Sequence, residues 1–189
     1  MNGLEMRSKF KRLYKKRVII DTCTITDLIE LNATYLPLEI FSEVYVSTNI
    51  FIEELDKQQA DELKKLGYKS LNLETNRGYA LFIQLEKEYR SLSIPDKIVI
   101  SIAYEKELVC CTNDANARKA CSEIGVEYAG TLGILCCAFE HEIIDKNTLS
   151  NLLSTYENEC SAFITSDIIQ PIRKVYGIPD NICIHSDVV

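Results

Sequence analysis

The sequence is poor in several features that mark common classes of protein. It has no tryptophan, only two histidines and only four prolines among 189 residues. No apolar run approaches the roughly 18–20 residues of a membrane-spanning helix, and the N-terminus lacks the apolar stretch and cleavage site of a signal peptide. We therefore expect a cytoplasmic protein without membrane contacts. The G-x-G-x-x-G pattern and the Walker phosphate loop are also missing, which argues against the common nucleotide-binding sites.

The scarcity of histidine limits the chemistry that this chain can carry out. A Cys/His zinc site, a Ser-His-Asp site or a Cys-His site would need His141 or His185, and neither lies in a recognisable nucleophile motif. The eight cysteines form no C-x-x-C pair, and four of them lie in the apolar runs VCCT and ILCCAF. We expect these cysteines to act as small buried hydrophobic side chains rather than as metal or redox groups.

Charge is distributed unevenly along the chain. The net charge is −7, but residues 1–17 carry seven basic residues and one acid, so this arm has +6 and the remainder has −13. A basic arm on an acidic body indicates an anionic partner. The alternative is a solvated helix that packs one face on the body, because Met6, Phe10, Leu13 and Tyr14 recur at helical spacing.

Segments rich in β-branched residues alternate with helical patterns along the chain. We expect strands at 17–21, 43–47, 69–73, 108–112 and 126–130. We expect helices at 22–32, 50–67, 76–92, 93–107, 113–125, 131–143, 145–158 and 165–176, the second of them capped by Thr48 or Asn49. This alternation predicts an α/β fold with three layers, in which a parallel sheet of about four to five strands lies between helices.

The composition, 47% hydrophobic, fits one compact domain with short appendages. We expect a basic N-terminal arm or helix over 1–17, a main domain over 18–160, and a C-terminal helix and tail over 161–189 that pack on that domain.

Acidic residues follow two of the predicted strands. Asp21 comes directly after the run VII, and Asp114 follows the strand LVCCT in the turn TND. The strand-to-helix turns of a parallel sheet gather at its carboxyl edge, where ligands bind. A lone carboxylate at the edge of an apolar layer is costly unless it finds a partner. The alternative for each acid is a helix cap, and Asn113 could cap in place of Asp114.

Two further acids lie at predicted helix starts. Asp96, in the segment SIPD, would lie near the strand ends, although Ser93 and Asp96 also resemble a capping box. Glu54 lies early in the helix after EVYVS, where the helix dipole also favours an acid. Glu53 is the rival for the same role, because successive residues point about 100° apart around a helix.

Four carboxylates gathered in one cleft favour a bound cation. Packed together they repel one another, and their pKa values rise unless a cation joins them. Oxygen ligands suit the hard cations Mg²⁺ and Mn²⁺. One or two such ions would activate a water and stabilise the charge on a phosphodiester. The four acids therefore predict a Mg²⁺- or Mn²⁺-dependent site for phosphodiester cleavage.

Four stretches of the sequence, found in this order, carry a family resemblance: VIIDTCTITDL, VSTNIFIEEL, SIPDKIVISIAYEKELVCCTNDANARKACSEIGV and GTLGIL. With the tail SAFITSDIIQPIRKVYG they make roughly residues 18–177 similar to the PIN-domain family, and most of all to its VapC-like toxin branch. The resemblance implies a PIN-like parallel sheet and Mg²⁺- or Mn²⁺-dependent cleavage of RNA. It also implies a homodimer and a small antitoxin protein that blocks the site.

Matched by position, the resemblance implies that Asp21, Glu54, Asp96 and Asp114 are the catalytic and metal-binding residues. Thr112 matches the small hydroxyl residue that often precedes the fourth acid.

The sequence departs from the family pattern near the first acid. Cys23 stands where the family commonly has Asn or Ser, which leaves the quartet whole but affects a supporting hydrogen bond. RNA phosphates would need cations near the acids. Lys97, Arg118 and Lys119 are the candidates, and an ordinary solvated helix face is the alternative for each.

These observations lead to two hypotheses of different classes. The first is a metal-dependent endoribonuclease that acts as the toxin of a toxin–antitoxin pair. The second is a non-catalytic module on the same fold, which binds RNA or protein through the basic arm and uses the acids as helix caps. A metal-dependent phosphatase is disfavoured, because the chain has no D-x-D motif and no clear phosphate loop.

Overall fold

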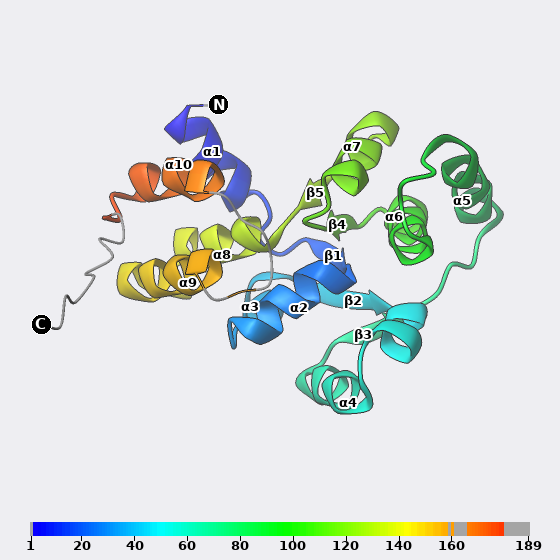
Figure 1. The fold of residues 1–189 in the computed structure, drawn as a ribbon, viewed down its shortest axis with the longest axis horizontal. Helices are drawn as coiled ribbons and strands as arrows, with labels where there is room; N and C mark the ends of the chain where they lie inside the picture. The colour runs from blue at the N-terminus through cyan, green and yellow to red at the C-terminus, as the bar shows by residue number, and fades with distance from the viewer. Residues whose placement is uncertain (1, 159, 161–165, 180–189) are drawn as a thin grey trace, which may run out of the picture.

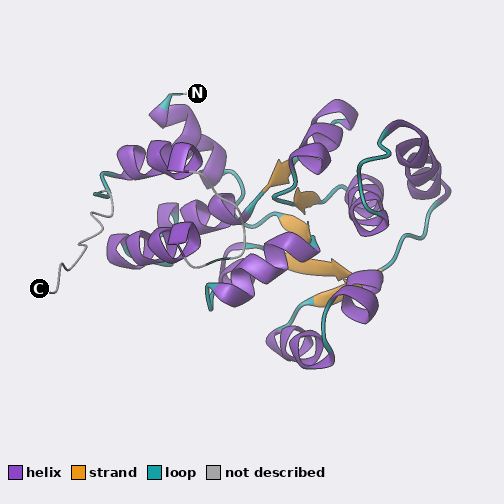
Figure 2. Ribbon diagram, in the orientation of Figure 1, coloured by secondary structure: helices purple, strands orange, loops and turns teal. Residues whose placement is uncertain are grey.

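A parallel sheet forms the centre of the protein. The computed structural model describes residues 2–158, 160 and 166–179. Within these residues, parallel strands form one sheet in the order β3-β2-β1-β4-β5 (Figures 1 and 2). The strands are β1 (Arg17–Ile20), β2 (Glu43–Ser47), β3 (Lys69–Leu71), β4 (Val109–Cys111) and β5 (Tyr128–Ala129). The central strand β1 buries Val18, Ile19 and Ile20 completely, as expected for a sheet covered on both faces.

Helices cover the sheet, which confirms the predicted three-layer α/β/α architecture. They are α1 (Gly3–Lys11), α2 (Thr22–Glu30), α3 (Leu36–Ile40), α4 (Lys57–Leu66), α5 (Asn76–Glu88), α6 (Ile94–Lys106), α7 (Ala115–Ile124), α8 (Thr131–Glu140), α9 (Lys146–Asn158) and α10 (Ser166–Tyr176). Helix α6 packs against β1, β2 and β4, and it also contacts α5 and α7. Helix α8 packs with α2 and α3, in a group that Figure 1 shows apart from α5, α6 and α7. Across the described residues, no helix combines the length and apolar character needed to cross a membrane.

The predicted long helix over 50–67 is wrong, because the chain breaks it into two parts. A π-helical turn, η1 (Ile50–Glu54), follows β2, and Leu55 after it has an extended backbone. Asp56 then caps α4, and its side chain accepts from the N–H of Gln59 in a capping box. The expected cap at Thr48 or Asn49 is also wrong, since Asn49 has a helical backbone and makes no capping hydrogen bond. The apolar periodicity of the sequence could not reveal this break, because η1 and α4 both bury apolar residues and so continue one amphipathic pattern.

The basic arm forms a helix that packs on the body. Helix α1 begins at a capping box made by Asn2 and Glu5, and it contacts α8. Nε of Arg7 donates to Oε1 of Glu140 over 2.6 Å, and Nζ of Lys11 lies 3.5 Å from the same carboxylate. At the other end of the described chain, α10 packs on α9 and lies beside α1 (Figure 1). The guanidinium of Arg7 lies over the ring of Tyr176, 5.5 Å from its centre. Both appendages therefore cover the same side of α8 and α9.

The four cysteines of the two apolar runs are buried as the sequence predicted, whereas Cys23 is exposed. Buried free thiols are found at Cys110, Cys111, Cys121, Cys136 and Cys137. Burial raises the pKa of the Cys137 thiol to about 12, so this side chain stays neutral. Two of the residues considered from sequence, 183 and 185, lie outside the described residues.

Candidate metal centre

The candidate site lies where two central strands end side by side. Strands β1 and β4 are neighbours, and the chain leaves β1 toward β2 on one side and β4 toward β5 on the other. The crevice at such a switch in strand order is the usual ligand site of open α/β sheets. Asp21 follows β1 directly, and its N–H donates to the carbonyl of Cys111 at the end of β4 over 3.0 Å. Asp114 follows β4 by three residues. The fold thus brings these two acids to one edge of the sheet.

Asp21 is a buried carboxylate with one oxygen in use and one without a partner. It caps α2, and Oδ1 accepts from the N–H of Thr24 over 2.8 Å. Oδ2 is buried and makes no hydrogen bond. Burial raises the pKa of Asp21 to about 6, and the charge of Asp96 raises it further, while the nearby hydroxyl of Thr112 and the N–H of Thr24 lower it. A buried oxygen without a hydrogen bond is costly, and a cation would satisfy it.

Asp96 and Asp114, like Asp21, each use only one carboxylate oxygen in hydrogen bonds at the start of a helix. Oδ2 of Asp96 accepts from the N–H of Ser93 over 3.1 Å and from its hydroxyl over 2.6 Å, at the start of α6. Oδ1 of Asp114 accepts from the N–H of Ala117 over 2.7 Å, at the start of α7. Among the described residues, the second oxygen of each carboxylate has no hydrogen bond. Capping and metal binding are therefore compatible in these three acids, because the cap takes only one oxygen of each.

The thiol of Cys23 is affected by several of these acids. Its pKa is raised to about 11, first by burial and then by the negative charges of Asp21, Asp96, Asp27 and Asp114. Three of the four predicted acids are thus near enough to act electrostatically on one atom, and a fourth carboxylate, Asp27, joins them. A thiol that is neutral at physiological pH is compatible with this acidic surrounding, and it adds no further charge.

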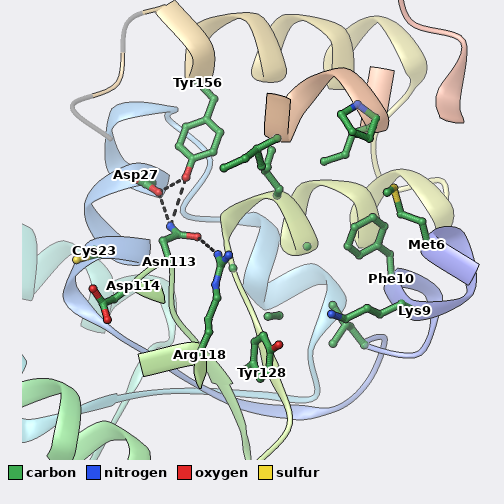
Figure 3. Close-up of a pocket in the computed structure, with 18 of the residues that line it drawn as sticks. Met6, Lys9, Phe10, Cys23, Asp27, Asn113, Asp114, Arg118, Tyr128 and Tyr156 are labelled. Carbon is green, nitrogen blue, oxygen red and sulfur yellow. Dashed lines mark hydrogen bonds between the residues drawn. The ribbon is translucent and has the colours of Figure 1, made fainter. Parts of the chain in front are cut away.

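Asp27 is a site residue that sequence reasoning missed. It is buried on α2, and its Oδ2 accepts from Nδ2 of Asn113 over 2.6 Å, from the hydroxyl of Thr131 over 2.8 Å and from the hydroxyl of Tyr156 (Figure 3). Burial raises its pKa, and the Tyr156 and Thr131 hydroxyls lower it. Asn113 is held by the same network, since its Oδ1 accepts from the N–H of Thr131 over 3.1 Å and from Nη2 of Arg118 over 3.0 Å.

A signal for Asp27 was present in the sequence. It lies between Ile25 and Leu28, on the same buried stripe as Thr24. Acidic residues are almost never buried without partners, so an acid on an apolar stripe indicates a polar network. The partners of Asp27 come from the turn after β4, from α8 and from α9, which the sequence could not place beside α2.

Comparison with known proteins identifies the family of this chain. A family model described as a PIN domain matches residues 17–177, which covers the sheet, the acids and the helices up to α10. The chain belongs to the PIN-domain family. PIN domains are generally nucleases and typically use divalent metal ions. No curated protein matches the chain.

Glu54 is the fourth predicted acid. It is exposed on the turn η1, and among the described residues its side chain makes no hydrogen bond or ion pair. Its rival Glu53 is also exposed and accepts from Nδ2 of Asn49 over 2.6 Å. The π-helical turn explains why a helix-based choice between the two could not be made, since a π turn changes the direction of each side chain relative to an α-helix.

The predicted RNA-binding cations differ in their exposure and in their ion pairs. Lys97 is buried, and its ammonium pairs with Glu86 over 2.6 Å. Lys119 is exposed and lies 4.0 Å from Glu123 on its own helix, which is the solvated alternative considered from sequence.

Arg118 is the cation that the fold directs toward the acids. Its Nε donates to the carbonyl of Thr112 over 2.9 Å, and its Nη2 donates to Asn113. Gly130 leaves room for this side chain, because a methyl group there would overlap both Arg118 and Asn113. Arg118 is therefore fixed beside the turn that carries Asp114.

The chemistry of this site of the PIN domain fits a divalent cation of the hard type. Within the described ranges, no three Asp, Glu, His or Cys side chains already stand at metal-binding distances from one common point. Mutually repelling carboxylates draw together only around a positive charge. The donors available are carboxylate oxygens, which suit Mg²⁺ and Mn²⁺, and the buried Oδ2 of Asp21 is the one most in need of a partner.

Proposed function

We propose that this PIN domain is a metal-dependent endoribonuclease in which Asp21, Asp96 and Asp114 hold Mg²⁺ or Mn²⁺. The observation that carries the proposal is the unpartnered, buried Oδ2 of Asp21, at the switch in strand order and within electrostatic reach of Asp96. The PIN-domain family supports it, because its members are generally nucleases. Glu54 is included as the fourth acid on the strength of the family resemblance alone.

The side chains would share the work as follows. The chemistry supplied by a bound divalent ion is activation of water and stabilisation of charge on the phosphodiester. Asp21 would bind through Oδ2 while Oδ1 keeps its position as the cap of α2. Asp96 and Asp114 would bind through the oxygens that their caps leave free. Thr112 would support Asp21 through its hydroxyl, which already lowers the pKa of that carboxyl. Arg118 would contact a phosphate of the RNA beside Asp114.

The experiment that tests the site pairs Asp21→Asn with Asp61→Asn. Asp61 is an exposed acid on α4 and lies outside the candidate site. The proposal expects Asp21→Asn to abolish Mn²⁺-dependent cleavage of RNA and Asp61→Asn to leave it unchanged. Circular dichroism of both variants checks that the fold is intact. Full activity in Asp21→Asn, with the fold retained, would sink the assignment.

A second candidate function rests on the capping hydrogen bonds themselves. Asp21 and Asp114 cap helices and Asp96 completes the capping box of Ser93, so a non-catalytic RNA- or protein-binding module would also keep these acids. A calorimetric titration with Mn²⁺ separates the two candidates. Binding in the millimolar range or tighter that is lost in Asp21→Asn supports the nuclease, whereas no binding in that range supports the module.

The finer proposal is that the nuclease is the VapC-like toxin of a toxin–antitoxin pair. It rests on the resemblance of the four sequence stretches, which also implies a homodimer and a small antitoxin protein. Induced expression in a bacterial host should stop growth with the unmodified chain and not with Asp21→Asn. Light scattering of the purified protein measures whether it is a dimer. Normal growth with the active protein would remove the toxin role and leave the nuclease proposal standing.

A further inference from the structure

A large cavity opens directly beside the candidate metal centre. Its volume is about 760 Å³, within the range of sites that hold small organic ligands. Asp114 and Cys23 lie at one end, next to the acids, and Met6 and Phe10 of α1 lie at the other (Figure 3). Helix α10 supplies a further wall with Ile168, among others. Helices α1 and α10 therefore enclose the edge of the site and form a pocket there.

One side of this pocket carries an opposed pair of charges held by one amide. Nη2 of Arg118 donates to Oδ1 of Asn113 over 3.0 Å, and Nδ2 of Asn113 donates to Oδ2 of Asp27 over 2.6 Å (Figure 3). Both charged groups line the pocket. Among the described residues, Oδ1 of Asp27 and Nη1 of Arg118 make no hydrogen bond, and neither atom is fully buried. A carboxylate acceptor and a guanidinium donor are thus both available to a ligand.

The remaining walls are apolar and partly flat. Phe10, Tyr128 and Pro171 line the pocket, together with Leu132 of α8. Lys9 lies over the ring of Tyr128 at 5.3 Å from its centre. Flat aromatic faces combined with a few fixed polar groups are the usual way in which proteins bind an unstacked nucleobase.

We propose that this pocket binds the base of the nucleotide next to the scissile phosphate, and that it prefers guanine. The proposal rests on the proposed nuclease function, which puts a phosphodiester beside Asp114 and so puts a neighbouring base within reach of the pocket. Guanine offers two adjacent N–H donors, N1 and N2, to Oδ1 of Asp27, the oxygen that the Asn113 network does not use. It also offers the acceptors O6 and N7 to the guanidinium of Arg118. Adenine and cytosine offer the carboxylate one amino group beside an acceptor nitrogen, and uracil offers one N–H between two carbonyls.

The test measures the binding of the four ribonucleosides by saturation-transfer and chemical-shift NMR, with the full chain and without divalent ions. The expected result is that guanosine binds at least about tenfold more tightly than the other three, because a bidentate contact of the Arg118 guanidinium with O6 and N7 discriminates by that order. Ile168→Glu should weaken guanosine binding several-fold, since it adds a negative charge at the pocket wall. Ile83→Glu on α5 is the matched control and should have no effect. The two side chains are equally exposed, at 50% and 54%, so neither change should disturb the core.

The outcomes separate this proposal from the nuclease proposal. No nucleoside binding in the millimolar range, equal binding of all four, or equal effects of Ile168→Glu and Ile83→Glu would each overturn the guanine pocket. None of these results depends on metal or on cleavage. If the protein cleaves RNA but fails these tests, the nuclease stands and the pocket proposal falls. If guanosine binds as expected but Asp21→Asn has no effect on cleavage, the pocket stands and the metal site falls.

Discussion

Replacing Asp21 with asparagine should make the metal-free protein more stable. The amide oxygen of asparagine caps a helix about as well as a carboxylate, so the side chain at position 21 still accepts from the N–H of Thr24 at the start of α2. The change removes a negative charge that lies among buried side chains and whose Oδ2 has no hydrogen bond. The carboxylate is costly in the folded protein without a cation, and the neutral amide is less so.

The size and pH dependence of this effect follow from the pKa of Asp21. The pKa is about 6 in the folded protein, against an ordinary value of 3.8. Between these pH values the folded state binds more protons at Asp21 than the unfolded state, so the free energy of unfolding falls as pH rises from about 4 to 6. The cost of burying the charged carboxylate is fully present above about pH 6 and corresponds to roughly 3 kcal/mol of unfolding free energy. We expect Asp21→Asn to gain about 1–3 kcal/mol at pH 8, because the buried amide keeps part of the burial cost.

Thermal denaturation at several pH values, with EDTA present, measures this gain. For a chain of this size, each kcal/mol should raise the melting temperature by about 2–4 °C. The gain should shrink toward pH 4, and added Mn²⁺ should stabilise the unmodified protein more than the variant. Asp61→Asn is the control and should show neither effect. A variant that is less stable than the unmodified protein at pH 8, or a gain that does not change with pH, would refute the reasoning.

Three other changes test the surroundings of the site. Gly130→Ala should lower the free energy of unfolding by about 1–3 kcal/mol, because the new methyl group overlaps Arg118 and its amide partner; an unchanged chemical-denaturation midpoint would contradict this. Tyr156→Phe should lower the free energy of unfolding by about 1.5–3 kcal/mol, because the variant lacks the hydroxyl that donates to the buried carboxylate of Asp27. The same denaturation experiment measures the loss. Glu54→Gln should reduce RNA cleavage while Glu53→Gln should not, and equal rates in the two variants would exclude Glu54 as the fourth acid.

The appendages give this PIN domain a feature that the central sheet alone would not have. Helices α1 and α10 lie beside each other over α8 and α9, and both contribute to the pocket next to the acids. The ion pair of Arg7 with Glu140, whose side chain is buried, ties α1 to α8. The buried apolar residues Ile169 and Ile172 hold α10 on the body.

The sequence alone determined the strand pattern and the parallel sheet, and it placed two candidate acids, Asp21 and Asp114, at one edge of that sheet. Short β-branched runs such as that of β1 are local signals, and strand–helix alternation leaves few topologies because crossovers are right-handed. The ends of parallel strands meet at one edge, so Asp21 and Asp114 could be placed together without a structure. Each of these inferences depends only on neighbours along the chain or on a general rule of sheets.

Only the tertiary structure decided which polar groups face one another. The network of Asp27 joins α2 to the turn after β4, to α8 and to α9, and no periodicity predicts contacts over such sequence separations. The break between η1 and α4 followed from a capping box at Asp56 that competes with a continuous helix. The capping or metal-binding role of Asp21 also needed atomic detail, because one carboxylate has two oxygens. The structure showed that the cap uses Oδ1 and leaves Oδ2 buried and free, which the sequence could not distinguish.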